Sequence, residues 1–288
     1  MKKFILRSAI FISTVSLIPL GFLSYLYITK KYESFVNGFE VYTSIKISNQ
    51  KSKKKKLLLG DSVAKQLFMY NHDNTDINSL ACNQAISMVG HFLLFKNYLA
   101  AGNKIDTVVM LMHPIISFKN NLDQVFTFHY FLKPFYKQEY KAEFSYNVNK
   151  QIKKIPFYKA SQFPLIIASN WSPNFKSKDL KIQTFLSPIT QEYLLKIKRL
   201  AENNNITFLI CPTPLRRSLK SSIDSIHAGK ISTPGLEKEF SLYFDKINYI
   251  DDKYYSDLPH LKKNFLLSHS NLLREVLYNY TSVTLVAE

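Results

Sequence analysis

The stretch Leu57-Leu58-Leu59-Gly60-Asp61-Ser62 indicates the fold of this chain. Three consecutive leucines bounded by a glycine are typical of a short strand that is buried on both faces of a parallel sheet. The apolar residues that follow, from Val63 to Tyr70, have helical spacing. A serine between a parallel strand and a helix lies at the edge of the sheet where ligands bind. We therefore predict that Ser62 lies at a functional site.

The rest of the chain repeats the alternation of strand and helix. Apolar runs predict further strands at residues 79–82, 107–112, 206–211 and 249–250, and helices at 86–101, 188–203 and 265–278. Ser187-Pro188 is a typical start of a helix, and Gly102 suits the residue after a helix end. Strands that alternate with helices imply an α/β domain, residues 57–288, whose central parallel sheet is covered on both faces.

A second motif, Asp257-Leu258-Pro259-His260, lies about two hundred residues after the first. It places an acid three residues before a histidine. Ser62, His260 and Asp257 supply a hydroxyl nucleophile, a base and an orienting carboxylate, which are the three parts of an activated serine. We expect Asp61 to support the turn rather than to serve as the acid of this triad.

The two motifs in this order resemble the SGNH (GDSL-type) hydrolase family, over roughly residues 56–280. Leu-Leu-Leu-Gly-Asp-Ser is similar to its first signature block, and Asp257-Leu258-Pro259-His260 to its last. The resemblance implies a flavodoxin-like three-layer fold, with serine, aspartate and histidine meeting at the carboxyl ends of the strands. An apolar span before the domain is similar to membrane-attached members linked to acyl modification of surface polymers.

The middle blocks of that family are altered here. They normally give a glycine and an asparagine to the oxyanion hole. After the second predicted strand the chain has Ala81-Cys82-Asn83-Gln84, and after the third it has His113-Pro114. Asn83 and His113 are the tentative replacements as oxyanion donors. Loss of one such donor typically lowers the rate roughly 100- to 1000-fold.

The N-terminal sequence predicts a membrane anchor. Residues 8–28 carry no charge and follow Lys2, Lys3 and Arg7, and their length suits a membrane span. Because apolar residues continue past a poor cleavage site at residues 21–24, we expect an uncleaved signal anchor, residues 1–30, rather than a secretory signal peptide. A stalk follows at residues 31–56, and its aromatic residues have the spacing to pack partly on the domain or on lipid headgroups.

The charge pattern alone does not decide the orientation of the span in the membrane, because lysines flank the span on both sides. The short basic tail favours an N-terminus inside the cell and a domain that faces the periplasm or the cell exterior. The predicted location is therefore the inner (plasma) membrane, crossed once.

The chain carries a formal net charge of +17. This charge favours an anionic partner such as lipid or a surface polymer. A genome of biased base composition, which yields proteins rich in lysine and asparagine, gives the same charge. No nucleic-acid motif is present.

Residues 118–180, approximately, form an aromatic and basic insertion. Its composition is consistent with three roles: binding of an anionic glycan, contact with the membrane interface, or an ordinary lid. Cys82 and Cys211 are expected as buried free thiols, and no cofactor or metal site is predicted.

These features together predict a membrane-anchored extracytoplasmic serine esterase or O-acyltransferase. Its substrate would be an acyl ester of cell-surface carbohydrate, and its other contacts would be membrane lipid and a partner membrane acyltransferase. Hydrolysis and transfer pass through the same acyl-enzyme, so the sequence does not distinguish between them. The alternative is a catalytically weak or inactive relative that binds a surface polymer or that acyltransferase. A purely structural envelope protein is a third reading.

Overall fold

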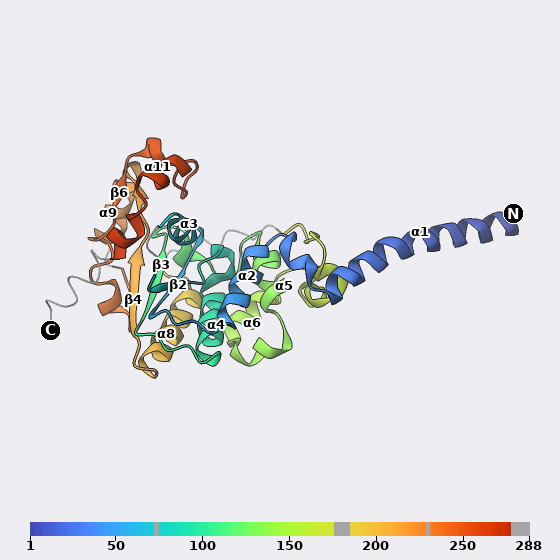
Figure 1. The fold of residues 1–288 in the computed structure, drawn as a ribbon, viewed down its shortest axis with the longest axis horizontal. Coiled ribbons are helices and arrows are strands. Elements are labelled where there is room, and N and C mark those ends of the chain that lie inside the picture. Colours follow the sequence, from blue (N-terminus) through green and yellow to red (C-terminus); the bar gives the residue numbers. More distant parts are fainter. Residues whose placement is uncertain (72–74, 176–184, 229–230, 278–288) are drawn as a thin grey trace.

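A computed structural model describes residues 1–71, 75–175, 185–228 and 231–277. Four parallel strands form the centre of the domain in the order β2-β1-β3-β4 (Figure 1). They are β1 (Lys56–Gly60), β2 (Ile77–Ser79), β3 (Thr107–Met112) and β4 (Thr207–Pro212). The α/β class and its central parallel sheet, predicted from the alternation of apolar runs, are therefore confirmed.

Helices cover both faces of the sheet. They are α3 (Ser62–Tyr70), α4 (Ser87–Ala100), α8 (Pro188–Glu202) and α11 (Lys263–Ser268). Leu57 and Leu59 face one apolar cluster, which contains side chains of α4 and α8. Leu58, between them, faces a second cluster, which contains side chains of α3 and α11. This alternation follows from the two-residue period of a strand and produces three layers.

Most predicted strands appear at their expected positions, with two differences. β2 ends at Ser79, earlier than the predicted strand at 79–82. Leu80 and Cys82 still donate their N–H groups to β1 carbonyls, but the chain then turns into the short helix η2 (Gln84–Ile86). The strand at Tyr249–Ile250 forms as β6, and it pairs with β5 (Leu215–Arg216) in a separate two-stranded sheet.

The predicted helix at 265–278 was wrong in extent. α11 ends at Ser268, and a second short helix occupies residues 272–277. The hydroxyl of Ser268 donates to helix carbonyls, and the His269 ring stacks on Phe265. Such local side-chain bonds compete with helix continuation. Tyr278, the predicted end, lies outside the described residues.

The aromatic insertion packs into the main core rather than forming a separate lid. Its elements are η3 (Ser117–Lys119), η4 (Phe128–Leu132), α5 (Lys133–Phe135), η5 (Gln138–Glu143), α6 (Tyr146–Ile152), η6 (Tyr158–Gln162) and α7 (Pro164–Ile167). Phe131, Phe135 and Val148 are fully buried in the cluster beneath α4 and α8. The last predicted residues of the insertion, 176–180, lie outside the described ranges.

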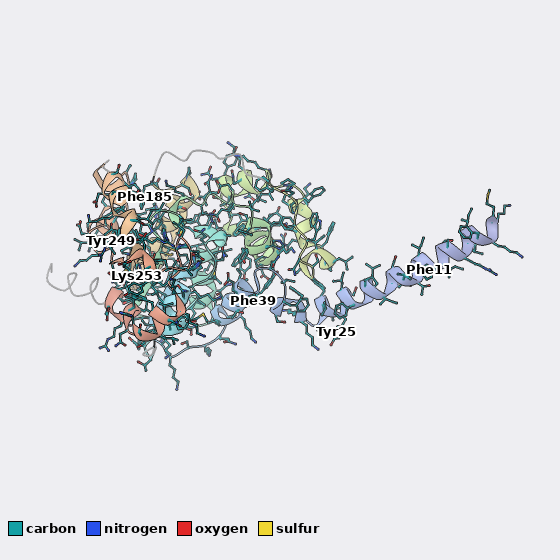
Figure 2. All side chains as sticks on the ribbon, turned by 90° about the horizontal axis from the view of Figure 1, so that it is seen from above. Phe11, Tyr25, Phe39, Phe185, Tyr249 and Lys253 are labelled. Atoms are coloured by element: carbon teal, nitrogen blue, oxygen red, sulfur yellow. The ribbon has the colours of Figure 1, made fainter. Side chains whose placement is uncertain are left out.

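The N-terminal helix α1 (Lys2–Ile28) projects from the body of the domain (Figure 1). Most of its apolar side chains, Phe11 among them, are exposed along the part of the helix that extends away from the domain (Figure 2). The helix is long and apolar enough to cross a membrane, and its exposure excludes a core helix. The following segment contains η1 (Lys31–Ser34) and α2 (Phe39–Ser48). α2 packs against α4 and buries Val41 completely.

The remaining elements lie between β4 and α11 in the sequence. They are η7 (Arg217–Leu219), α9 (Lys220–Ala228), α10 (Glu237–Phe240) and η8 (Asp252–Tyr254). Cys82 and Cys211 are buried and unpaired, as predicted, and burial raises the pKa of both thiols. They are therefore unreactive core residues rather than nucleophiles.

Candidate active site

Ser62 is the first residue of α3 and lies at the carboxyl end of β1. The preceding Asp61 caps the helix, because its side chain accepts hydrogen bonds from the N–H groups of Val63 and Ala64. Gly60 is required at the strand end. A Cβ there would lie 2.4 Å from the Leu111 carbonyl oxygen of β3. The Gly-Asp-Ser order therefore fits a tight strand-to-helix turn that exposes the Ser62 hydroxyl at the sheet edge.

Asp257 and His260 lie on one narrow loop. A β-bridge between Tyr255 and Leu261 closes the loop, and the Ser256 N–H donates to the His260 carbonyl at 2.9 Å. Within the loop, the His260 N–H donates to Asp257 Oδ1 at 3.0 Å. The same oxygen lies 2.9 Å from His260 Nδ1. The acid and the imidazole are therefore held together before any contact with Ser62.

The loop places His260 against Ser62. Ser62 Oγ lies 2.8 Å from His260 Nε2, across 198 residues of sequence. A carboxylate only accepts hydrogen bonds, so Nδ1 carries a proton toward Asp257 and Nε2 is left to accept from the Ser62 hydroxyl. This is the geometry of a serine, a general base and an orienting acid. The structure therefore brings together the three residues that the two motifs suggested.

Asp257 stays ionised although it belongs to a partly covered site. Partial burial alone raises the pKa of Asp257, but hydrogen bonds from His260 and the charges of His260 and Arg216 outweigh it. The net effect holds this pKa below its ordinary value. Arg216, which no sequence pattern indicated, donates to the Asp257 carbonyl and lies over the Tyr255 ring. The Asp257 side chain is 57% exposed, so the acid is open to water.

Gln66 fixes the loop to the helix that carries the serine. Its side-chain nitrogen donates to the Leu261 carbonyl at 2.8 Å, and its oxygen accepts from the Leu261 N–H at 3.0 Å. Gln66 stands four residues after Ser62, so both point from the same face of α3. The four-residue spacing is the only sequence signal for this contact, and Gln66 was not among the predicted site residues.

Asp61 holds the turn, as expected, and also joins two strand ends. Its Oδ2 accepts from the His113 N–H and from the Ser117 hydroxyl, each at 2.6 Å. Its Oδ1 serves the helix cap. The side chain is almost fully buried, so its charge is balanced by these four donors rather than by solvent. Asp61 therefore fixes the position of His113 relative to Ser62.

His113 follows β3 next to Asp61 and keeps one buried ring N–H unpaired among the described residues. The Ile115 N–H donates to His113 Nδ1, so Nε2 carries the proton. His113 Nε2 is buried, and within the described ranges it has no hydrogen-bond partner. Burial lowers the pKa of His113, against the opposing effect of Asp61, and His260 lowers it further. A neutral imidazole with an unpaired donor thus lies near His260.

Asn83 lies at the end of the extended stretch after β2. Its side-chain oxygen accepts from the Ala85 N–H at 2.9 Å and caps η2. That bond orients the carboxamide and leaves its NH₂ group as a donor. Thr213, which follows β4 and was not predicted, has a buried hydroxyl without a partner in the part of the chain that the structure describes. Met112 and Pro212 are paired in register, so His113 and Thr213 leave neighbouring strands side by side.

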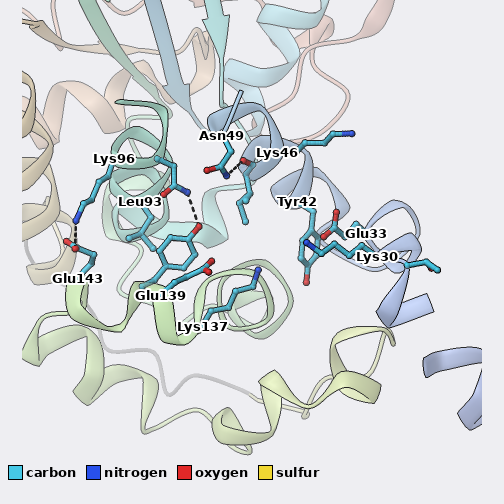
Figure 3. Close-up of a pocket in the computed structure, with 14 residues that line it drawn as sticks. Lys30, Glu33, Tyr42, Lys46, Asn49, Leu93, Lys96, Lys137, Glu139 and Glu143 are labelled. Carbon is cyan, nitrogen blue, oxygen red and sulfur yellow. Dashed lines mark hydrogen bonds and ion pairs between the residues drawn. The ribbon is translucent and has the colours of Figure 1, made fainter. Parts of the chain in front are cut away.

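A polar cavity of about 870 Å³ lies elsewhere in the molecule, between α2, α4 and η5 (Figure 3). Lys46, Lys137 and Glu139 line it, and Asn97 donates to the Tyr140 hydroxyl on its wall. None of its lining residues belongs to the triad. We take the triad and not this cavity as the candidate catalytic site, because only the triad contains a positioned nucleophile.

Comparison with protein-family models, with curated proteins and with solved structures finds no match to this chain. In the described parts of the chain, no group of three or more His, Cys, Asp and Glu side chains is arranged to hold a metal ion. The chemistry of the site is therefore inferred from its geometry alone.

Proposed function

We propose that this chain is a serine esterase or O-acyltransferase of SGNH type, held at a membrane by α1. The observation that carries the proposal is the continuous contact from Ser62 Oγ through the His260 ring to Asp257. A serine that only caps a helix does not require contact with a histidine that is itself hydrogen-bonded to a carboxylate. The flavodoxin-like arrangement of the family is part of this proposal, supported by the parallel sheet with helices on both faces.

The proposed reaction begins with attack of Ser62 Oγ on the carbonyl carbon of an acyl ester. His260 Nε2 takes the hydroxyl proton, and Asp257 stabilises the imidazolium. The tetrahedral intermediate collapses, and its leaving alcohol takes the proton from His260. Water or a second hydroxyl then attacks the acyl-serine and gives its proton to His260, and Ser62 recovers that proton as the product leaves.

Three donors are available for the oxyanion of the intermediate. The Ser62 N–H lies at the positive N-terminus of α3, while Asp61 is occupied with the next two N–H groups. The NH₂ group of Asn83 and the Nε2–H of His113 are the further candidates. His113 would thus provide the donor that an asparagine supplies in the family that the sequence resembles. Neutral His113 suits this role, since it donates without adding a charge that would disturb His260.

The substrate class follows from the anchor and the open site. We propose acyl esters of cell-surface carbohydrate, reached by a domain that faces the periplasm or the cell exterior from the inner (plasma) membrane. The exposed Asp257 indicates that a bulky polymer, rather than a small enclosed molecule, can approach the triad. Transfer instead of hydrolysis requires that a bound acceptor hydroxyl reach the acyl-serine before water does.

The test is to treat the full chain, in detergent, with a fluorophosphonate and measure its intact mass. We expect one adduct on the wild-type protein and none on Ser62→Ala, while Ser268→Ala, which removes an exposed hydroxyl from α11, keeps the adduct. An adduct that persists in Ser62→Ala would contradict the proposal.

The second candidate is a catalytically weak or inactive protein that binds a surface polymer or a partner membrane acyltransferase. The polar cavity away from the triad supports it, because its size suits a ligand site. Absence of any adduct on the folded wild-type protein would favour this candidate.

A further inference from the structure

One short helix of the insertion packs directly on the membrane-type helix. Ile167 of α7 and the adjacent Ala168 form a small buried cluster with Leu23 and Leu26 of α1. Tyr32, Val36 and Tyr42 complete the same cluster from the segment after α1. Figure 1 shows the yellow-green segment around α7 against the domain-side end of α1. The insertion and the anchor are thus in direct contact.

The position of this contact along α1 determines how deep the domain lies in the membrane. The uncharged run of the sequence continues to Ile28, so Leu23 lies five residues inside its end. With a rise of about 1.5 Å per residue, Leu23 is about 7 Å below the level of Ile28. If residues 8–28 cross a bilayer, α7 cannot pack on Leu23 without entering the interface between headgroups and hydrocarbon. The contact therefore places part of the folded domain at membrane depth.

The side chains that α7 and its neighbours expose suit that depth. Phe157 is 66% exposed, Phe163 is 61% exposed and Trp171 is 43% exposed. Leu165, within α7, is exposed as well. Two of these rings are held in place: Phe157 and Trp171 are in edge contact at 5.9 Å, and Trp171 also contacts the buried Phe128. Rigid aromatic side chains with this exposure are typical of the membrane–water interface.

The charge of the segment points to the same partner. No acidic residue occurs between Glu143 and Asp179. Lys153, Lys154 and Lys159 are exposed beside the aromatic side chains. Each basic residue close to an anionic membrane surface contributes about 1 kcal/mol of attraction. Aromatic rings flanked by lysines without acids match anionic phospholipid headgroups over hydrocarbon.

We propose that residues 157–171 form a bilayer-seating surface, which enters the headgroup region of the membrane that α1 crosses. The inference rests on the proposed anchoring by α1. It goes beyond that proposal, because a single helix with a free stalk would let the domain tumble, whereas this surface fixes its tilt and height. α11, which follows the catalytic loop, then lies at the end of the body away from α1 (Figures 1 and 2). The triad would be presented to polymer above the membrane, not to lipid within it.

The test uses Trp171, the only tryptophan of the chain. The full chain is reconstituted into liposomes of phosphatidylcholine and phosphatidylglycerol, with acyl chains either normal or brominated near the headgroup. Bromine quenches tryptophan on contact. We expect a loss of Trp171 emission in brominated liposomes. The matched control is Trp171→Phe combined with Leu267→Trp, which moves the reporter to a 51% exposed position on α11 and should show no quenching.

Flotation of the liposomes separates the possible failures. Protein that floats with the liposomes but keeps its Trp171 emission would overturn the seating surface and leave the anchor intact. Protein that does not float would overturn both. Fluorophosphonate labelling of Ser62 reports on the catalytic proposal independently of either result. The double variant Phe163→Ser with Leu165→Ser should reduce quenching while resistance to trypsin stays unchanged. Undiminished quenching in that folded variant would contradict the assignment.

Discussion

Gln66 and Leu261 are joined by two hydrogen bonds, one to each polar group of the Leu261 backbone. Gln66 lies one turn after Ser62, and Leu261 directly follows His260. The pair therefore sets the position of His260 over Ser62 from outside the reacting atoms. Together with the contact between His260 and Ser62, these two bonds tie the carboxyl-terminal loop to α3, and the first prediction follows from them.

Gln66→Leu should slow fluorophosphonate labelling of Ser62 by about 100-fold, since a misplacement of about 1 Å at a reacting pair can have that effect. The measurement is the second-order labelling rate by intact mass. Gln191→Leu, on α8, is the matched control and should label at the wild-type rate. An unchanged rate in Gln66→Leu would show that the loop holds its position without the clamp.

Asp257→Asn should lower the rate of ester turnover by roughly 100- to 10,000-fold, because an amide no longer fixes the imidazole tautomer or stabilises its positive charge. A chromogenic acetyl ester serves as substrate. Asp224→Asn is the control, since its side chain is 58% exposed, close to the exposure of Asp257, but lies on α9. Equal losses in the two variants would point to a general effect of charge.

His113→Phe should lower turnover by about 100- to 1000-fold with little change in KM, if His113 Nε2–H stabilises the oxyanion. A ring of comparable shape keeps the packing but removes the donor, together with the Nδ1 atom that accepts from the Ile115 N–H. His129→Phe, a buried histidine of the insertion, serves as the control. A rise in KM with unchanged kcat would instead assign His113 to substrate binding.

Asp61→Asn should destabilise the protein by about 1–3 kcal/mol, because the amide NH₂ would face either the His113 N–H or the helix cap and leave buried donors unpaired. Urea unfolding of the full chain in detergent measures this. Asp106→Asn changes an exposed acid just before β3 and should leave the midpoint unchanged. A wild-type midpoint in Asp61→Asn would mean that the network around the turn contributes little.

Stability should fall as the pH is lowered, partly through His91. This residue is fully buried in α4, and burial lowers its pKa from 6.5 to about 3. The unfolded state therefore takes up a proton below about pH 6.5 that the folded state refuses, so the contribution is complete above that pH and is lost below it. His91→Met should reduce the slope of unfolding free energy between pH 6 and pH 4 by about 1.4 kcal/mol per pH unit. Leu94→Met, which changes another fully buried but non-titrating residue of α4, should leave the slope unchanged.

The sequence was sufficient for the elements whose pattern is local. β1, β3 and α8 follow from runs of apolar residues and from the Ser187-Pro188 start. The end of α11 was missed, because the bonds of Ser268 and the stacking of His269 depend on the exact geometry of one turn. The role of Asp61 in the turn was foreseen, while its bonds to His113 and Ser117 cross more than fifty residues and have no sequence signature.

The sequence by itself determined the α/β pattern, the apolar N-terminal helix and the residue types of the triad, because periodicity and motif spacing act over short distances. The tertiary structure alone decided that His260 Nε2 meets Ser62 Oγ, that Gln66 clamps the loop and that α7 packs on α1. These contacts join segments far apart in the chain. Their geometry is set by how the strands stack and how the loops close, and no local pattern of residues encodes it.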